Sequence, residues 1–378
     1  MRWTDEVLDP MRSEGDPLAA HAVDALGREH GAQATAIVFR TMSANDDPLP
    51  ADAPAAIAEF FATTHALPAG ADLPRIRRGE DVFMTHAFPA ALVLLTRSLP
   101  AGYAAPNLAK VLFVSGDLIR SPYRRLLGVL QMVVNACSCG GCEPGGKAIV
   151  TAQKLRLLHE GVRRIVRRQR PDYEARYGVP VNHEDMMATI LGFSYLVIEG
   201  WRTLGLGLTR AEEEDYYYVW RVFAQLMGIP AERVPVDVAD AAAFYAAYAR
   251  RHYVGAADNP EGVALAKANV DMLRGFIPRP LRWLGLGVVP RLYMRLLLRP
   301  SEADDIGIRP VRAHRLLEAL LPVLPWLWLS PWKSVDRRDR HLHAAISRGL
   351  FQGLIDRTWN GEVCFLVPAS LADLRRLA

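Results

Sequence analysis

The stretch KLRLLHEGVRRIVRRQRPDYEARYGVPVNHEDMMATILGFS, residues 154–194, decides the fold class of this chain. At 100° per residue, its first half places five apolar side chains along one side of a helix: Leu155, Leu158, Val162, Ile165 and Val166. Turn residues interrupt the pattern at 177–182, and an apolar segment follows. The stretch therefore predicts two long helices, over 147–170 and 183–205.

Helical periodicity continues along most of the chain. It predicts further helices over 16–30, 52–66, 81–98, 106–119, 122–136, 210–228, 238–252, 258–275, 309–323 and 338–356. The clearest strand signal is a short FLV run after Cys364, and an alternating βαβ pattern is absent. We therefore predict an all-α fold. Residues 1–275 would form a single large helical domain, and residues 276–378 an appended helical, apolar segment or a part of that same domain.

The composition bounds the class of protein. Of the 378 residues, 51% are hydrophobic, which is enough for a large core, and the net charge of +4 is too small to indicate a nucleic-acid partner. The first residues include acids and lack an apolar signal segment, which predicts a cytoplasmic protein. Two apolar stretches, 281–298 and 316–332, mix Trp, Leu, Arg and Pro. They predict either core or a peripheral membrane contact.

His159 lies at the rim of the apolar face of its helix, and Arg156 and Arg163 lie just beyond it on the polar side. This arrangement suits a haem. Apolar walls would hold the ring, an imidazole nitrogen would bind the iron, and guanidinium groups would bind the propionates. We therefore predict His159 as a metal ligand, with Arg156 and Arg163 as cofactor-binding residues. The alternative, which the pattern alone favours, is a partly buried histidine on an ordinary amphipathic helix.

A cluster of cysteines precedes this helix. Cys137, Cys139 and Cys142 have C-x-C-x-x-C spacing, and with Cys364 they could hold zinc or an iron–sulfur cluster. The alternative is a loop of small residues whose thiols stay reduced. The run GCEPGGKA (141–148) has phosphate-loop spacing, but Ala148 stands where Ser or Thr must reach magnesium. These glycines instead predict a tight loop leading into the His159 helix.

The second helix of the opening stretch begins with three titratable residues. Asn182 has the position of an N-cap, and His183, Glu184 and Asp185 follow it. Adjacent residues on a helix diverge by 100°, so these three side chains cannot all face one metal ion. They predict a solvated start of the helix.

Four segments together resemble a known family. They are LPAGYAAPNLAKVL (99–112), SPYRRLLGVLQMV (121–133), EPGGKAIVTAQKLRLLHEGVRR (143–164) and YGVPVNHEDMMATILGFS (177–194). In this order and spacing the chain is similar, from about residue 80 to 255, to the latex-clearing-protein and MpaB-type oxygenases. The resemblance implies a mostly helical fold with globin-like packing around one b-type haem. Characterised members cleave carbon–carbon double bonds of isoprenoid chains with dioxygen.

The resemblance also implies roles for particular residues. The family's haem-ligand histidine falls on His159, and a helix threonine near the haem falls on Thr189. An arginine falls on Arg124 or Arg125, where it would stabilise negative charge on a propionate or on reduced oxygen. Arg124, Arg125 and Thr189 are therefore the predicted catalytic residues, and His159 is the predicted iron ligand.

The sequence departs from the rubber-cleaving members at two places. Their Lys-Thr pair falls on Leu127 and Gly128, or on Gly128 and Val129, and their acidic residue falls near Leu108 or Ala109. The predicted function is a haem b-dependent oxygenase that acts with dioxygen on an apolar, unsaturated, isoprenoid or lipid-like substrate. One alternative is a haem- or lipid-binding protein without turnover, and another is a metal or redox protein built on the cysteine cluster.

Overall fold

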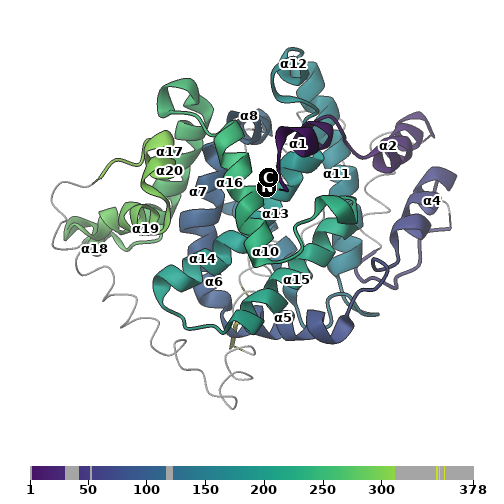
Figure 1. Ribbon diagram of the computed structural model, residues 1–378, viewed down its shortest axis with the longest axis horizontal. Helices are drawn as coiled ribbons and strands as arrows, with labels where there is room; N and C mark the ends of the chain where they lie inside the picture. The colour runs from purple at the N-terminus through teal and green to yellow at the C-terminus, as the bar shows by residue number, and fades with distance from the viewer. Residues whose placement is uncertain are drawn as a thin grey trace.

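The computed structural model describes residues 2–29, 42–51, 53–115, 122–310, 346, 347, 349 and 353. Every regular element in these ranges is a helix, which confirms the all-α prediction (Figure 1). The strand predicted after Cys364 lies outside the described residues. So do nearly all of the helices predicted over 309–323 and 338–356.

The helices follow one another with short connections. In chain order they are α1 (Asp5–Arg12), α2 (Pro17–Glu29), α4 (Ala55–Thr64), α5 (Leu73–Thr85), α6 (Ala87–Val93), the π-helix η1 (Leu94–Ser98), α7 (Leu99–Tyr103), α8 (Pro106–Ser115), α10 (Pro122–Cys137), α11 (Ala148–Gln169), α12 (Tyr173–Tyr177), α13 (His183–Phe193), α14 (Tyr195–Leu204), α15 (Arg210–Leu226), η2 (Ala231–Arg233), α16 (Val238–His252), η3 (Ala256–Asp258), α17 (Pro260–Gly275), α18 (Arg279–Trp283), η4 (Leu286–Val288), α19 (Val289–Leu297) and α20 (Pro300–Asp305).

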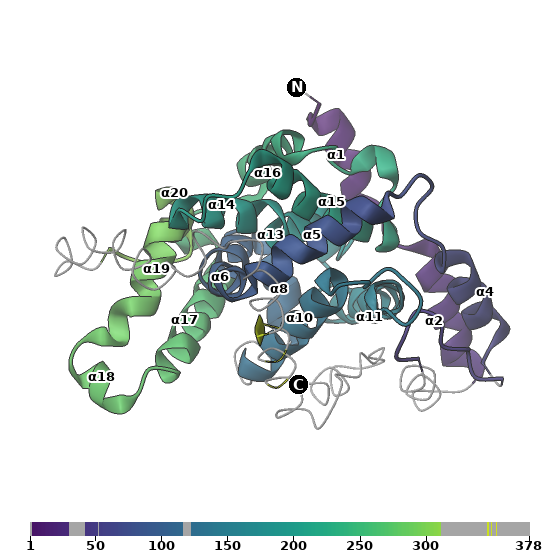
Figure 2. The ribbon, with the colours of Figure 1, turned by 90° about the horizontal axis from the view of Figure 1, so that it is seen from below.

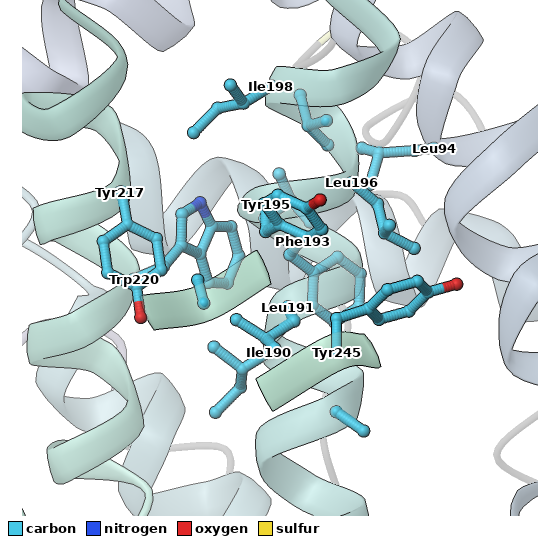
Figure 3. Close-up of a cluster of buried hydrophobic side chains, with 14 of the residues drawn as sticks. Leu94, Ile190, Leu191, Phe193, Tyr195, Leu196, Ile198, Tyr217, Trp220 and Tyr245 are labelled. Atoms are coloured by element: carbon cyan, nitrogen blue, oxygen red, sulfur yellow. The ribbon is translucent and has the colours of Figure 1, made fainter. Parts of the chain in front are cut away.

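Helix α13 lies at the centre of the molecule. It packs against α1, α7, α14, α15 and α16, and its apolar side chains meet aromatic rings from α15 and α16 (Figure 3). Asn182 caps it by accepting a hydrogen bond from the Asp185 backbone N–H at 2.8 Å, as predicted. The single helix predicted over 183–205 divides at Ser194, whose φ of −112° and ψ of −81° depart from helical values.

The helix predicted over 81–98 is three elements. Asp72 caps α5 with its carboxylate, so that helix begins at Leu73, and the chain bends at His86 before α6. Pro89 follows three residues later and has no N–H to donate to Thr85, so the helical pattern loses a hydrogen bond where the chain bends. Helix α5 packs closely along α15, whose start carries a capping box between Thr209 and Glu212.

The described part of the predicted C-terminal extension, residues 276–310, joins the main core. Helix α19 packs against η1 and α17, and α20 packs against α7 and α19. The side chains that these helices and the following residues add to the core include Met294, Leu297, Ala303 and Ile306. The proposed boundary at residue 275 stays a prediction.

No single helix in the described ranges combines the length and the apolar composition needed to cross a bilayer. One pair meets those two criteria jointly, Leu73–Thr85 with Ala87–Tyr103, and the two parts are bent by 77°.

Candidate functional site

Helix α11 carries His159 and begins where the sequence predicts. The preceding loop is tight: a Cβ atom on Gly146 would stand 2.2 Å from the Gly140 carbonyl oxygen. The helix starts at Ala148 and packs against α2, α8, α10 and α15, with α10 and α11 side by side in Figure 2. His159 is half-buried, and Leu155, one turn earlier, is half-buried as well. The histidine therefore lies at the rim of the apolar face, as predicted.

Apolar side chains on α8, α10 and α11 combine core contacts with access to solvent. They are Leu108, Leu112, Val129, Leu130 and Leu155, all partly buried and packed against the main core. A Cβ atom added to Gly128 of α10 would meet no atom of the described residues within 4 Å. Helix α11 packs against both α8 and α10, so the accessible apolar side chains belong to three helices that contact one another through α11.

Thr189 is the exposed position of α13. Each of the other ten residues of this helix is buried, although α13 is the central helix of the fold. The Thr189 hydroxyl donates to the Asp185 carbonyl one turn earlier, at 2.8 Å. Solvent-accessible surface therefore reaches into the middle of the bundle at a residue that can still accept a hydrogen bond.

Arg156 and Arg163 are bound to groups of the chain itself. Arg156 donates to both oxygens of Asp16, at 2.6 and 3.0 Å. Arg163 is buried, donates to the Val181 carbonyl at 2.7 Å and lies 3.4 Å from a Glu160 carboxylate oxygen. These contacts fix α11 to the N-terminal segment and to the turn before α13. The propionate-binding role of the two arginines stays a prediction.

Arg124 and Arg125 belong to the first turn of α10, one turn before Gly128. Their side chains lie outside the described part of the structure, so their catalytic role also stays a prediction. The neighbouring Tyr123 packs edge-on against Phe276, which follows α17, with ring centroids 5.7 Å apart.

The prediction of a solvated start for α13 is wrong. His183, Glu184 and Asp185 are all buried. Asp185 accepts hydrogen bonds from Asn107 of α8 and from the Tyr248 hydroxyl of α16, the latter at 2.9 Å. Burial raises the pKa of Asp185 to about 6, against the lowering effect of nearby positive charge and of these two donors.

The neighbouring Glu184 has partners of its own. One of its carboxylate oxygens accepts from His252 Nε2 at 2.9 Å and from Arg251 Nε at 3.0 Å. The sequence does contain a signal for this burial. From Met186 to Phe193 apolar residues occupy nearly every face of the helix, which is typical of a helix enclosed on all sides.

The cysteine loop is organised around a buried carboxylate. Glu80 of α5 accepts from the backbone N–H groups of Gly140 and Gly141, at 2.8 and 3.1 Å. Cys137 and Cys142 are buried and Cys139 is exposed.

Burial, followed by the negative charge of Glu80, raises the pKa of Cys142 to about 12, which disfavours a thiolate ligand. Among the described residues no group of three His, Cys, Asp or Glu side chains is placed to hold a metal ion. Cys364 lies outside those residues, so in the described part of the chain the cysteine-metal alternative has no support.

Comparison with known proteins gives the family. The family described as ER-bound oxygenase mpaB/B'/rubber oxygenase, catalytic domain, matches residues 75–326, which is more than half of the chain. The chain belongs to this family. The predicted resemblance to latex-clearing and MpaB-type oxygenases is therefore confirmed. All six predicted site residues lie inside the matched span, whereas α1, α2 and Asp16 precede it.

Two mpaB/rubber oxygenase relatives extend the comparison. The rubber oxygenase of Streptomyces sp. (strain K30) is 25% identical over 324 residues, which cover 82% of this chain and 74% of that protein. The solved structure of latex clearing protein LCP in the closed state superposes with a TM-score of 0.73. It is 20% identical, and the match covers 90% of this chain and 91% of that one. The described helices thus share the fold of that structure.

Proposed function

We propose that this chain is a haem b-dependent oxygenase that acts with dioxygen on an apolar, unsaturated, isoprenoid or lipid-like substrate. Membership of an oxygenase family supports the reaction class, and the name of the Streptomyces relative supports an isoprenoid type of substrate. The observation that carries the proposal is the exposure of Thr189 within the otherwise buried α13. Ligand sites of helical proteins lie between the helices of the bundle, so exposed surface on a central helix marks a candidate site.

The accessible residues of α8, α10 and α11 fit a haem. The ring needs apolar walls, and Leu112, Val129 and Leu155 offer apolar surface that other side chains leave accessible. The iron needs an imidazole, and His159 lies on the same helix as Leu155, one turn away. The absence of a side chain at Gly128 leaves further room beside α10. We assign His159 as the iron ligand on this basis.

When bound, the haem would supply the iron that activates dioxygen. The chain's own residues would prepare the rest of the site. The apolar side chains of α8 and α10 would hold the substrate's double bond and exclude water. Thr189 would accept one hydrogen bond, and Arg124 or Arg125 would balance negative charge on a propionate or on reduced oxygen.

A haem- or lipid-binding protein without turnover is the second candidate. The buried Leu127 and the adjacent Gly128 favour it, because they stand where rubber-cleaving members of the family carry polar side chains. Neither residue offers a group that can transfer a proton.

Absorption spectra test the cofactor. The wild-type protein, purified from haem-supplemented cells, should show a Soret band that His159→Ala loses or shifts. His65→Ala is the matched control, because His65 is exposed at the end of α4, and this variant should keep the band. Absence of a Soret band in the wild type would contradict the haem assignment.

Oxygen consumption then separates the two candidates. An unsaturated isoprenoid oligomer should raise the rate and yield carbonyl products, whereas its saturated counterpart should not. Thr189→Val should keep the Soret band and lower the rate by about tenfold, the effect of one lost hydrogen bond near the reacting atoms. A haem-loaded protein that consumes no oxygen with either compound would favour the binding protein.

A further inference from the structure

Residues 274–291, from the last residues of α17 to the first residues of α19, form an apolar surface that the rest of the described chain does not cover. Trp283 is 96% exposed, Leu284 77% and Phe276 57%. Leu281 and Leu286 are exposed as well, and neither α18 nor η4 contains a buried residue. In Figure 2 this segment projects from one end of the molecule, far from α2 and α4. We call residues 274–291 the α18 projection.

The charged side chains of the α18 projection are all positive. Between Asp271 and Glu302 the sequence contains no acidic residue and six arginines. Two of the six, Arg295 and Arg299, pair with carboxylates of the body, at 2.6 Å from Asp304 and 3.7 Å from Glu199. The other four belong to the projection and flank its apolar side chains: Arg274, Arg279, Arg282 and Arg291.

We propose that the α18 projection docks this protein on the surface of an anionic phospholipid bilayer. Trp283 and Leu284 would enter the boundary between headgroups and acyl chains, where an indole ring is favoured. The four arginines would contact the lipid phosphates, and an acidic lipid would strengthen each contact. The positive charge favours a bilayer over a second copy of the projection. An apolar patch ringed by arginines alone is complementary to an anionic surface, whereas two copies of the patch would repel each other.

The projection adjoins the candidate site. Phe276 packs against Tyr123 at the start of α10, the helix that carries Gly128 and Val129. A docked bilayer would therefore lie next to the end of a helix that offers accessible apolar surface, which suits a lipophilic substrate. The docking proposal itself rests on exposure and charge and does not require the haem.

Vesicle sedimentation tests the docking. The full chain is mixed with phosphatidylcholine vesicles that contain or lack phosphatidylglycerol, at low and at physiological salt. Binding should require the anionic lipid and should weaken with salt, because ions screen exposed charges. Trp283→Ser/Leu284→Ser and Arg279→Glu/Arg282→Glu should each lower the affinity at least about tenfold, as expected for loss of interfacial burial or of two phosphate contacts.

Matched controls lie on other faces. Val236→Ser removes an apolar side chain that is also exposed, and Arg210→Glu/Arg250→Glu reverses two exposed charges on α15 and α16. Both should bind like the wild type. All variants should keep the thermal midpoint, because the substituted side chains bury little surface.

Equal binding by the projection variants and the wild type would overturn the proposal, as would binding that ignores the anionic lipid. A shift from dimer to monomer in Trp283→Ser/Leu284→Ser, with no vesicle binding by the wild type, would overturn it in favour of a contact between copies.

Discussion

Arg156 of α11 and Asp16, just before α2, form a bidentate ion pair with both side chains largely buried, at 2.6 and 3.0 Å. The pair joins the family-matched span to an N-terminal segment that precedes it. The Arg156 guanidinium also lies over the Phe60 ring of α4, at 5.3 Å from its centroid. One arginine thus connects α11 to both N-terminal elements beside it.

We expect Asp16→Ala to lower the free energy of unfolding by about 3 kcal/mol, because it leaves a buried guanidinium without its carboxylate. Urea denaturation measures the change. The control is Glu174→Ala, which removes the partner of Arg167 in an exposed pair at 2.7 Å and should change stability by less than about 1 kcal/mol. Equal effects of the two substitutions would show that the burial of the Asp16 pair is unimportant.

Gly79 allows α5 to approach α15. A Cβ atom at this position would stand 2.2 Å from the Asp215 carbonyl oxygen, which is backbone and cannot rotate away. We expect Gly79→Ala to destabilise the fold by about 3 kcal/mol, near the upper end for overpacking. Gly275→Ala is the control, because a Cβ there meets nothing within 4 Å, and helix propensity should make that change neutral or stabilising. Thermal unfolding of both variants measures the effect, and equal midpoints for the two would contradict the close approach of α5 and α15 at Gly79.

The sequence predicts where the long helices begin better than it predicts where they are interrupted. Periodicity and capping place α11 and α16 within a residue of their observed starts, because these signals are local. The division of α13 from α14 is not predicted, because the apolar pattern continues through Ser194 with no glycine or proline at the break. The short helices α18–α20 have too few residues for a period to show.

The site depends on contacts that no local pattern contains. Arg156 meets Asp16 across 140 positions of sequence, and Asp185 meets Asn107 across 78. Asp185 was predicted to be solvated because its position at a helix start is usually exposed, whereas here α8 and α16 cover it. The exposure of Thr189 has the same origin, because it depends on which neighbours leave that face of α13 open.

The thiols of the cysteine loop should differ in reactivity. Cys139 is exposed, whereas Cys137 and Cys142 are buried and burial raises the pKa of both. Because the thiolate is the reactive form, brief alkylation of the folded protein should label Cys139 first. Mass spectrometry of the peptides gives the order, and unfolding in urea should remove the difference.

Cys139→Ala should leave the content of zinc and iron unchanged. Elemental analysis of the purified variant beside the wild type measures it, with the Soret band as the reference for haem iron. Loss of a metal while the Soret band persists would revive the cysteine-centred alternative and would place the missing ligands outside the described residues.

Glu80 should make the stability depend on pH near neutrality. Its side chain is 1% exposed, and burial raises its pKa from 4.5 to about 7, although the two backbone donors of the loop lower it. The folded state therefore binds the proton more tightly than the unfolded state. Protonated Glu80 therefore adds to the free energy of unfolding, and this stabilisation is complete below the pKa of the unfolded state. It is lost as the pH rises through about 7, and the free energy of unfolding then falls by at most about 3 kcal/mol.

Urea denaturation at about pH 5 and about pH 8 measures this loss, and Glu80→Gln should reduce the difference between the two values. A part of the difference in unfolding free energy should persist in this variant. The pKa of the buried Asp185 is also raised, to about 6, so deprotonation of Asp185 lowers stability over the same pH range. Glu59→Gln, at an exposed position of α4, should behave like the wild type. If Glu80→Gln keeps the full difference, the carboxyl group of Glu80 is already charged throughout this range.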